Sequence, residues 1–228
     1  MLASSRLLRV PSDQHGLTLG DFLVPVRIGE RLSSRARHVM LVVIGALLVV
    51  IGARISFYLP TDPYVPVSLQ TFGVLFGGAL LGFRRGLLAV LLYLVLGLFL
   101  PVYALDAASG TYRHGLDTII AIQGGQVVLG VTGGYLLGFL LAAAVAGRLA
   151  ELGWDRRLVG SLAAMLVGDA AIYLVGLPWL AAAAHLSPAD TIAAGLTPFL
   201  VGDIVKLVVA ALLLPVGWWV VARRPSDR

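Results

Sequence analysis

Long apolar runs separated by short polar breaks dominate the chain from about residue 39 onward. A helix needs roughly 20 mostly apolar residues to cross the hydrocarbon core of a bilayer, and six segments approach that length. The pattern therefore predicts an all-α integral membrane protein with six transmembrane helices. The predicted segments are Val39–Leu59, Val67–Phe83, Gly86–Leu105, Gln126–Ala150, Leu158–Leu180 and Thr197–Val221.

The breaks between the segments set the predicted connections. Pro60, Pro63 and Pro66 separate the first two segments, and Arg84-Arg85 makes a very tight second loop. The second segment is short, so a tilted or partly irregular element fits there. The weakly polar stretch 106–125 is long, and we expect a lid or a short external helix in it.

Composition and charge give this pattern an orientation. Hydrophobic residues make up 59% of the chain and charged residues 13%, whereas soluble domains carry about 25% charged residues. In the six-helix topology, 14 of the 17 basic residues fall on one side, and the positive-inside rule makes that side cytoplasmic. Both termini are then predicted to be cytoplasmic (N-in/C-in). The net charge of +5 indicates the membrane orientation and does not favour nucleic-acid binding. These basic residues are Arg6, Arg9, Arg27, Arg31, Arg35, Arg37, Arg84, Arg85, Arg148, Arg156, Arg157, Arg223, Arg224 and Arg228.

The chain ends are polar and flank a single membrane domain. Residues 1–38 are expected to form a cytoplasmic N-terminal arm on the anionic inner leaflet, and no cleavable signal peptide is evident in them. Residues 39–222 form the predicted transmembrane domain, and residues 223–228 a cytoplasmic tail.

Three ionisable residues lie inside the predicted helices. Charged groups in a membrane are costly and mark functional sites by default, and Asp169, Asp203 and Lys206 all fall in the outer half of the bilayer. Lys206, the only lysine, is three residues after Asp203, so both share a helix face. A self-neutralising Asp203–Lys206 pair is the simplest structural interpretation. Asp169 leaves one charge unmatched unless it is a neutral carboxylic acid, and this imbalance favours a polar ligand site.

The chain lacks the motifs of several enzyme classes. It contains no cysteine, no Walker A motif, no zinc-binding H-E-x-x-H and no G-x-S-x-G nucleophile elbow. An aspartyl dyad of Asp169 and Asp203 is disfavoured, because Lys206 would keep Asp203 ionised. We therefore predict no catalytic residues, no metal site, no cofactor and no enzymatic activity.

Small and aromatic residues add candidates near the three charges. Gly130, Gly134 and Gly138 are spaced by four, which favours close helix packing. Gly133 and Gly134 also offer bare backbone donors at the start of the fourth helix. Tyr173 follows Asp169 by four residues, on the same face.

Several stretches together resemble the BioY family of biotin transporters, the substrate-binding (S) components of energy-coupling factor (ECF) transporters. The resemblance implies a six-helix S-component fold with biotin bound near the outer surface. It also implies a membrane coupling (T) subunit and two cytoplasmic ATPase subunits as partners, in the cell (plasma) membrane of a prokaryote. The similar stretches are VPVSLQTFGVL (65–75), LGLFLPVYA (96–104), GVTGGYLLGF (130–139), GDAAIYLVGLPWL (168–180) and FLVGDIVK (199–206).

The resemblance assigns roles to the candidate residues. Lys206 is expected to bind the carboxylate of biotin, while Asp203 and Asp169 orient it or accept from the ureido N–H groups. The remaining expected biotin-binding residues are Gln70 of the family's LQ motif, Gly133, Gly134 and Tyr135 of its TGGY motif, and Tyr173.

Two other functions stay open on the sequence. One is a secondary transporter that moves a small carboxylate together with protons through Asp169. The other is a non-transport scaffold in which the glycine stripes bury a structural salt bridge. Action without the ATPase subunits is a variant of the leading hypothesis.

Overall fold

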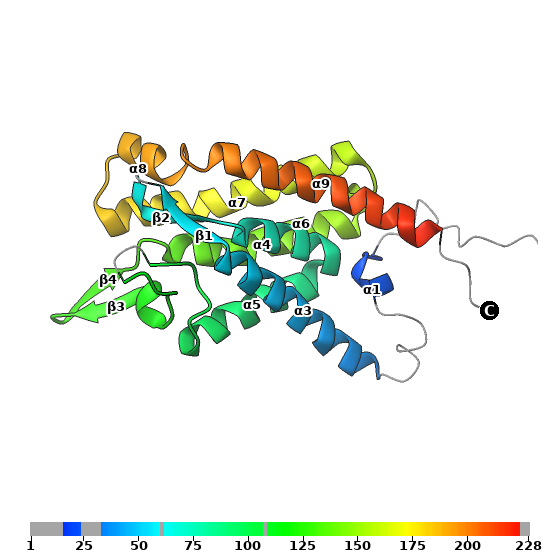
Figure 1. The fold of residues 1–228 in the computed structure, drawn as a ribbon, viewed down its shortest axis with the longest axis horizontal. Helices are drawn as coiled ribbons and strands as arrows, with labels where there is room; N and C mark the ends of the chain where they lie inside the picture. The colour runs from blue at the N-terminus through cyan, green and yellow to red at the C-terminus, as the bar shows by residue number, and fades with distance from the viewer. Residues whose placement is uncertain (1–15, 24–32, 60–61, 107–108, 224–228) are drawn as a thin grey trace, which may run out of the picture.

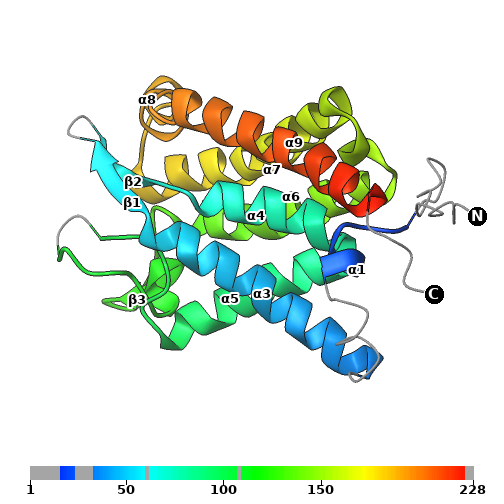
Figure 2. The same ribbon diagram turned by 45° about the vertical axis from the view of Figure 1, so that its right-hand side comes forward.

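A computed structural model describes residues 16–23, 33–59, 62–106 and 109–223. Helices run side by side along the long axis of the molecule, with two β-hairpins at one end (Figures 1 and 2). The main helices are α3 (Ser34–Arg54), α4 (Gln70–Leu81), α5 (Phe83–Phe99), α6 (Gly133–Glu151), α7 (Leu158–Ala184) and α9 (Leu200–Ala222). The shorter elements are α1 (Gly20–Leu23), η1 (Leu116–Thr118), η2 (Trp154–Arg156), α8 (Pro188–Gly195) and strands β1 (Ser56–Leu59), β2 (Asp62–Ser68), β3 (Ile120–Gln123) and β4 (Gln126–Leu129).

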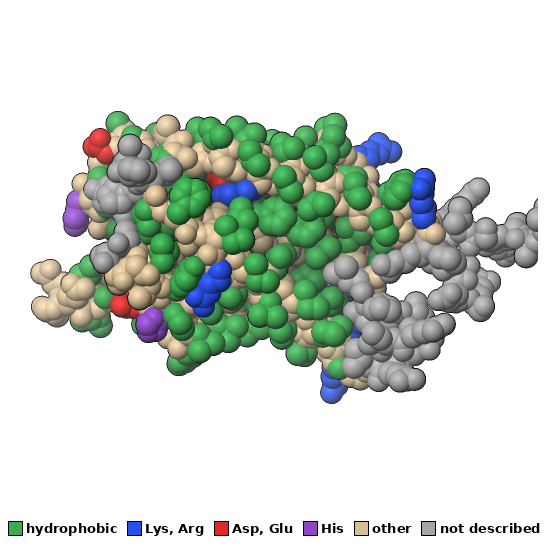
Figure 3. All heavy atoms as spheres, viewed as in Figure 1, with side chains coloured by type: hydrophobic (Ala, Val, Ile, Leu, Met, Phe, Trp, Pro, Cys, Tyr) green, Lys and Arg blue, Asp and Glu red, His purple; other side chains and the backbone are tan. Residues whose placement is uncertain are grey.

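The helical membrane architecture is confirmed at a coarse level. Among the described residues, four helices are long and apolar enough to cross a bilayer, namely α3, α6, α7 and α9. Helices α4 and α5 have 12 and 17 residues, so they are shorter than the roughly 20 residues that a perpendicular span requires. The surface visible in Figure 3 is covered mainly by hydrophobic side chains, as expected for helices that contact lipid.

The prediction of an all-α protein is wrong at two connections. The first predicted segment ends early, because α3 stops at Arg54 and residues 56–59 form strand β1, which pairs with β2 in an antiparallel hairpin. Pro63 and Pro66 lie within β2, where proline is tolerated because a strand with a single partner has an unpaired edge. The second helix then starts at Gln70 instead of Val67.

The fourth predicted helix also starts later than expected. Residues 126–129 form strand β4, which pairs with β3 around a Gly124-Gly125 turn in which both residues have positive φ. Such a turn matches the right-handed twist of the strands, and glycine adopts it without steric cost. Helix α6 begins only at Gly133. The stretch predicted as a lid or short external helix therefore contains the 3₁₀ turn η1 and most of a hairpin.

Helices α6 and α7 make the most extensive contact in the bundle. A Cβ atom added at Gly138 would lie 2.9 Å from the backbone oxygen of Ile172, and one at Gly134 would lie 2.2 Å from the Cβ of Trp179. The predicted packing role is thereby confirmed for Gly134 and Gly138, because the two helices approach too closely for larger side chains. Gly130 precedes α6 and lies against the backbone of Thr118 instead.

The end of the bundle opposite the hairpins contains a buried carboxylate. Asp155 of η2 is 0% exposed, and its Oδ2 accepts a hydrogen bond of 2.6 Å from Trp218 of α9. Its Oδ1 has no hydrogen-bond partner among the described residues. Burial raises the pKa of Asp155 to about 6, since an ionised carboxylate is poorly solvated there.

We expect Asp155 to make the protein less stable as the pH rises from about 4 to 6. The native state holds this proton more tightly than the unfolded chain, so deprotonation lowers the free energy of unfolding by roughly 3 kcal/mol. Thermal unfolding of the detergent-solubilised protein should show the midpoint falling by roughly 5–10 °C over this range and levelling off above it. Asp155→Asn should remove this pH dependence of the unfolding midpoint, because the amide oxygen of asparagine accepts the hydrogen bond from Trp218 and carries no charge. The exposed Asp190→Asn should retain it.

Candidate functional site

A cavity lies between helices α4, α6, α7 and α9, at the end of the bundle that carries the hairpins. Its volume is about 60 Å³, room for only a few water molecules. Pockets that hold organic ligands measure about 300–1,000 Å³, so the walls must separate when such a ligand binds. Apolar side chains form most of the wall, including Leu136, Phe139, Ile172 and Phe199.

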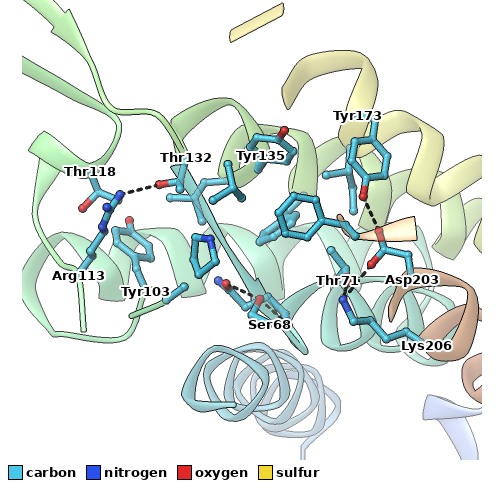
Figure 4. A pocket seen from close by; sticks show the side chains of 18 residues that line it. Ser68, Thr71, Tyr103, Arg113, Thr118, Thr132, Tyr135, Tyr173, Asp203 and Lys206 are labelled. Carbon is cyan, nitrogen blue, oxygen red and sulfur yellow. Dashed lines mark hydrogen bonds and ion pairs between the residues drawn. The ribbon is translucent and has the colours of Figure 1, made fainter. Parts of the chain in front are cut away.

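One end of the cavity is formed by an ion pair on α9 (Figure 4). The Lys206 ammonium lies 2.9 Å from Asp203 Oδ1 and donates a second hydrogen bond of 3.2 Å to the Thr71 hydroxyl of α4. The Tyr173 hydroxyl of α7 donates to the other oxygen of Asp203. Asp203 and Lys206 are buried, at 5% and 8% exposure. The predicted pairing is confirmed, and three helices position it.

Asp169 is close to this pair but does not line the cavity. Its side chain is 8% exposed and interacts electrostatically with both Asp203 and Lys206. Its Oδ1 atom is buried without a hydrogen-bond partner in the described part of the chain. Two carboxyl groups therefore lie near one ammonium group, although only Asp203 of the two lines the cavity. A direct contact between Asp169 and a ligand stays a prediction.

The other end of the cavity is formed by Arg113, which the sequence reasoning did not select (Figure 4). Arg113 lies in the connection between α5 and α6, where its guanidinium contacts Asp106 at 2.8 Å and Thr132 at 3.5 Å. The only sign of Arg113 in the sequence is that it is the single arginine or lysine in the weakly polar stretch 106–125. Helical spacing could not place it, because a loop brings it to the cavity.

Gln70 and Tyr135 line the cavity wall, as the sequence led us to expect. The Gln70 amide donates to the Tyr93 hydroxyl at 2.5 Å and accepts from Ser68 at 2.9 Å. The Tyr135 hydroxyl donates to the Gly195 carbonyl at 2.9 Å, and its ring packs edge-on against Tyr173. Both side chains are therefore held in place by the protein before any ligand arrives.

Gly133 and Gly134 lie against α7 and not at the wall of the cavity. Both are buried, and the side chain of Trp179 lies against both of them. The Gly133 N–H donates to the Gly130 carbonyl at 2.9 Å. Neither residue lines the cavity, so their expected contact with a ligand stays a prediction.

The chemistry of the cavity suits a small, mainly apolar molecule with polar groups at its ends. Each end is lined by one cation, and each cation is paired with a carboxylate. Hydroxyl groups lie beside both pairs. Such an arrangement binds and orients a ligand. The described residues contain no cluster of three histidine, aspartate or glutamate side chains suited to a metal ion.

Comparisons with known proteins cover most of the chain. The sequence model of the BioY family matches residues 27–223. A probable biotin transporter BioY of Pyrococcus horikoshii is 36% identical over 181 residues, which are 78% of this chain and 94% of the relative. The biotin transporter BioY of Thermotoga maritima is 39% identical over 167 residues, which are 73% of this chain and 86% of that relative.

The fold also has a counterpart among solved structures. A crystal structure of the S-component for biotin from an ECF-type ABC transporter superposes with a TM-score of 0.67 at 22% sequence identity. The superposition covers 81% of this chain and 93% of that chain. At this level of identity the likeness shows the fold, which is that of an S component.

Proposed function

The chain belongs to the BioY family, and from this membership we propose that it is the biotin-binding S component of an ECF-type vitamin transporter. The observation that carries the proposal is the buried Asp203–Lys206 pair at one end of an apolar cavity, within a chain that matches the family over residues 27–223. A binding subunit needs such a cavity and needs no catalytic group.

The cavity matches the chemistry of biotin along its length. Biotin has an apolar ring and chain between a ureido group, which donates and accepts hydrogen bonds, and a carboxylate. The apolar walls suit the middle of this molecule, and the polar groups at the two ends of the cavity suit its ends. The aromatic pair Tyr135 and Tyr173 supplies flat surfaces for the ring.

We assign the carboxylate of biotin to Lys206. An ammonium group has three N–H donors, and two of them are directed at Asp203 and Thr71. Within the described part of the chain the third donor has no hydrogen-bond partner, so it is available to a ligand. The guanidinium of Arg113, in contrast, is directed at Asp106, Thr132 and Tyr58.

The proposed context is a multi-pass protein of a prokaryotic plasma membrane with six membrane helices and both termini in the cytoplasm. The excess of arginine at one end of the bundle supports this orientation. In this orientation the cavity would lie near the outer surface. Membership of the BioY family favours a membrane coupling (T) subunit and two cytoplasmic ATPase subunits as partners. The ATPase subunits would supply the Walker A motif that this chain lacks.

Calorimetric titration of biotin into the purified detergent-solubilised chain tests the proposal. We expect tight, saturable binding of biotin and no binding of thiamine or riboflavin, which lack a carboxylate. A folded sample that does not bind biotin would refute the assignment of the ligand.

Asp169 favours a second candidate function, a proton-coupled transporter of a small carboxylate. Its unpartnered oxygen beside the ion pair is a site at which a proton can bind. Uptake into cells that survives ATP depletion, collapses with an uncoupler and is lost in Asp169→Asn would favour this function over the S component.

A further inference from the structure

A second, larger cleft lies beside the outer end of the cavity. It has a volume of about 310 Å³ and is formed by the connection between α5 and α6, with Asp106, Ser109, Tyr112 and His114 among its lining residues. Arg113 and Thr118 line both this cleft and the cavity. These two side chains therefore form the boundary between the outer space and the ligand cavity.

The main chain of Arg113 is fixed, so only its side chain is free to move. Its N–H donates to the Ala104 carbonyl and its carbonyl accepts from the Tyr103 N–H, both at 3.1 Å. An isolated antiparallel bridge between Leu105 and Tyr112 joins the same two segments next to these hydrogen bonds. We therefore expect a change at the boundary to be a rotation of the Arg113 side chain rather than a movement of the loop that carries it.

Asp106 holds the guanidinium at the boundary. Its Oδ2 atom lies 2.8 Å from both Nε and Nη2 of Arg113. Its Oδ1 atom accepts from the backbone N–H and the hydroxyl of Ser109, at 2.9 and 3.0 Å. The hydrogen bonds from Ser109, with the charge of Arg113, lower the pKa of Asp106, which keeps it ionised as a partner for the arginine.

The contact between Asp106 and Arg113 is the contact that a carboxylate ligand would make at the same place. Both side chains of the pair are partly exposed, at 24% and 21%, so an incoming anion can reach the guanidinium from the outer cleft. Replacing one carboxylate by another at a guanidinium conserves the charge and the number of hydrogen bonds. The guanidinium therefore keeps its charge partner in the exchange, while the displaced Asp106 can keep its two hydrogen bonds from Ser109 and must be solvated by water in the outer cleft.

We infer that the outer cleft is a capture site for small carboxylates, in which the ligand displaces Asp106 from Arg113 before it moves into the cavity. This inference rests on the proposed function, because the captured ligand is the one that the cavity binds. Arg113 then contacts the carboxylate during capture, and Lys206 contacts it in the final complex. Asp106 is a positioning residue that competes with the ligand for the guanidinium.

The inference predicts changes in the rate of ligand binding. Stopped-flow measurements with biotin and biotin methyl ester give the association and dissociation rate constants separately. Asp106→Asn should raise the association rate constant for biotin about tenfold, because the competing carboxylate is gone. Arg113→Gln should lower it about tenfold. The dissociation rate should change less than twofold in both variants, and the uncharged ester should associate at the same rate with all proteins.

Two further variants keep the test decisive. Ser109→Ala removes the one hydrogen bond that the Ser109 hydroxyl donates to Asp106 and changes no charge. It should raise the association rate about threefold. Asp190→Asn removes one carboxylate charge at α8, on the same end of the bundle, and should leave the rate unchanged. If Asp106→Asn and Asp190→Asn accelerate binding equally, general charge steering explains the effect and the inference is overturned.

The remaining outcomes also support or overturn the capture site. An effect of Arg113→Gln on dissociation alone would make Arg113 a residue of the final complex and overturn capture. Wild-type protein that binds biotin with rates insensitive to Asp106→Asn and Ser109→Ala overturns only the inference. Wild-type protein that does not bind biotin overturns the proposed function and the inference together.

Discussion

Lys206→Met is expected to weaken biotin binding by about 100-fold or more. The ammonium group supplies a charge-assisted hydrogen bond to the carboxylate, and such bonds contribute about 1.5–3 kcal/mol. Its removal also leaves Asp203 as an uncompensated buried charge next to the ligand's own carboxylate, and breaking a buried pair in this way costs about 3–5 kcal/mol. Calorimetric titration at constant pH measures the loss directly.

The same substitution is also expected to destabilise the empty protein, so a control must separate binding from folding. Asp203→Asn combined with Lys206→Met removes both charges, which restores electrostatic balance without restoring the donor to the ligand. We expect the double variant to recover most of the thermal stability and none of the affinity. Recovery of both would show that Lys206 acts only by neutralising Asp203.

A second ligand tests which group of biotin Lys206 contacts. Wild-type protein should bind biotin more tightly than biotin methyl ester, and Lys206→Met should bind the two equally. If Lys206→Met retains the preference for the free acid, the carboxylate lies at Arg113 in the bound complex. If Lys206→Met binds biotin within twofold of the wild type, the proposed role of Lys206 is wrong.

Local sequence patterns predicted the helices and the ion pair well. Apolar runs in α7 and α9 are long and continuous, so their identification needs no tertiary information. Asp203 and Lys206 are three residues apart on one helix, and helical geometry alone brings them together. Their burial follows from the cost of charged groups in a membrane, which directs such side chains toward the interior of the bundle.

The hairpins and the place of Arg113 could not be predicted in this way. Strand β2 contains Pro63 and Pro66 and gains its partner only from β1, so its local sequence indicates a loop. Arg113 reaches the cavity through a fold of the α5–α6 connection that no periodicity encodes. Gly133 and Gly134 were placed by a motif, but their environment depends on Trp179, more than 40 residues further along the chain.

Gly134→Ala is expected to destabilise the protein by about 3 kcal/mol, at the upper end of the cost of overpacking one methyl group. The added Cβ would lie 2.2 Å from the Cβ of Trp179 and 3.0 Å from the Val175 carbonyl oxygen. Neither atom can rotate away, because both are fixed by the α7 backbone. The helices must therefore separate, which also strains the 2.9 Å hydrogen bond from Trp179 to the Gly130 carbonyl.

Thermal unfolding measures this effect, and Gly202→Ala is its matched control. A Cβ at Gly202 of α9 meets no atom within 4 Å, so the same change should leave the unfolding midpoint unchanged or slightly raised. Gly134→Ala should lower the midpoint by several degrees and weaken biotin binding less than Lys206→Met does, since it moves Tyr135 and Tyr173 apart without removing a polar contact. Unchanged stability with a selective loss of affinity would instead support a direct contact between the Gly134 backbone and the ligand.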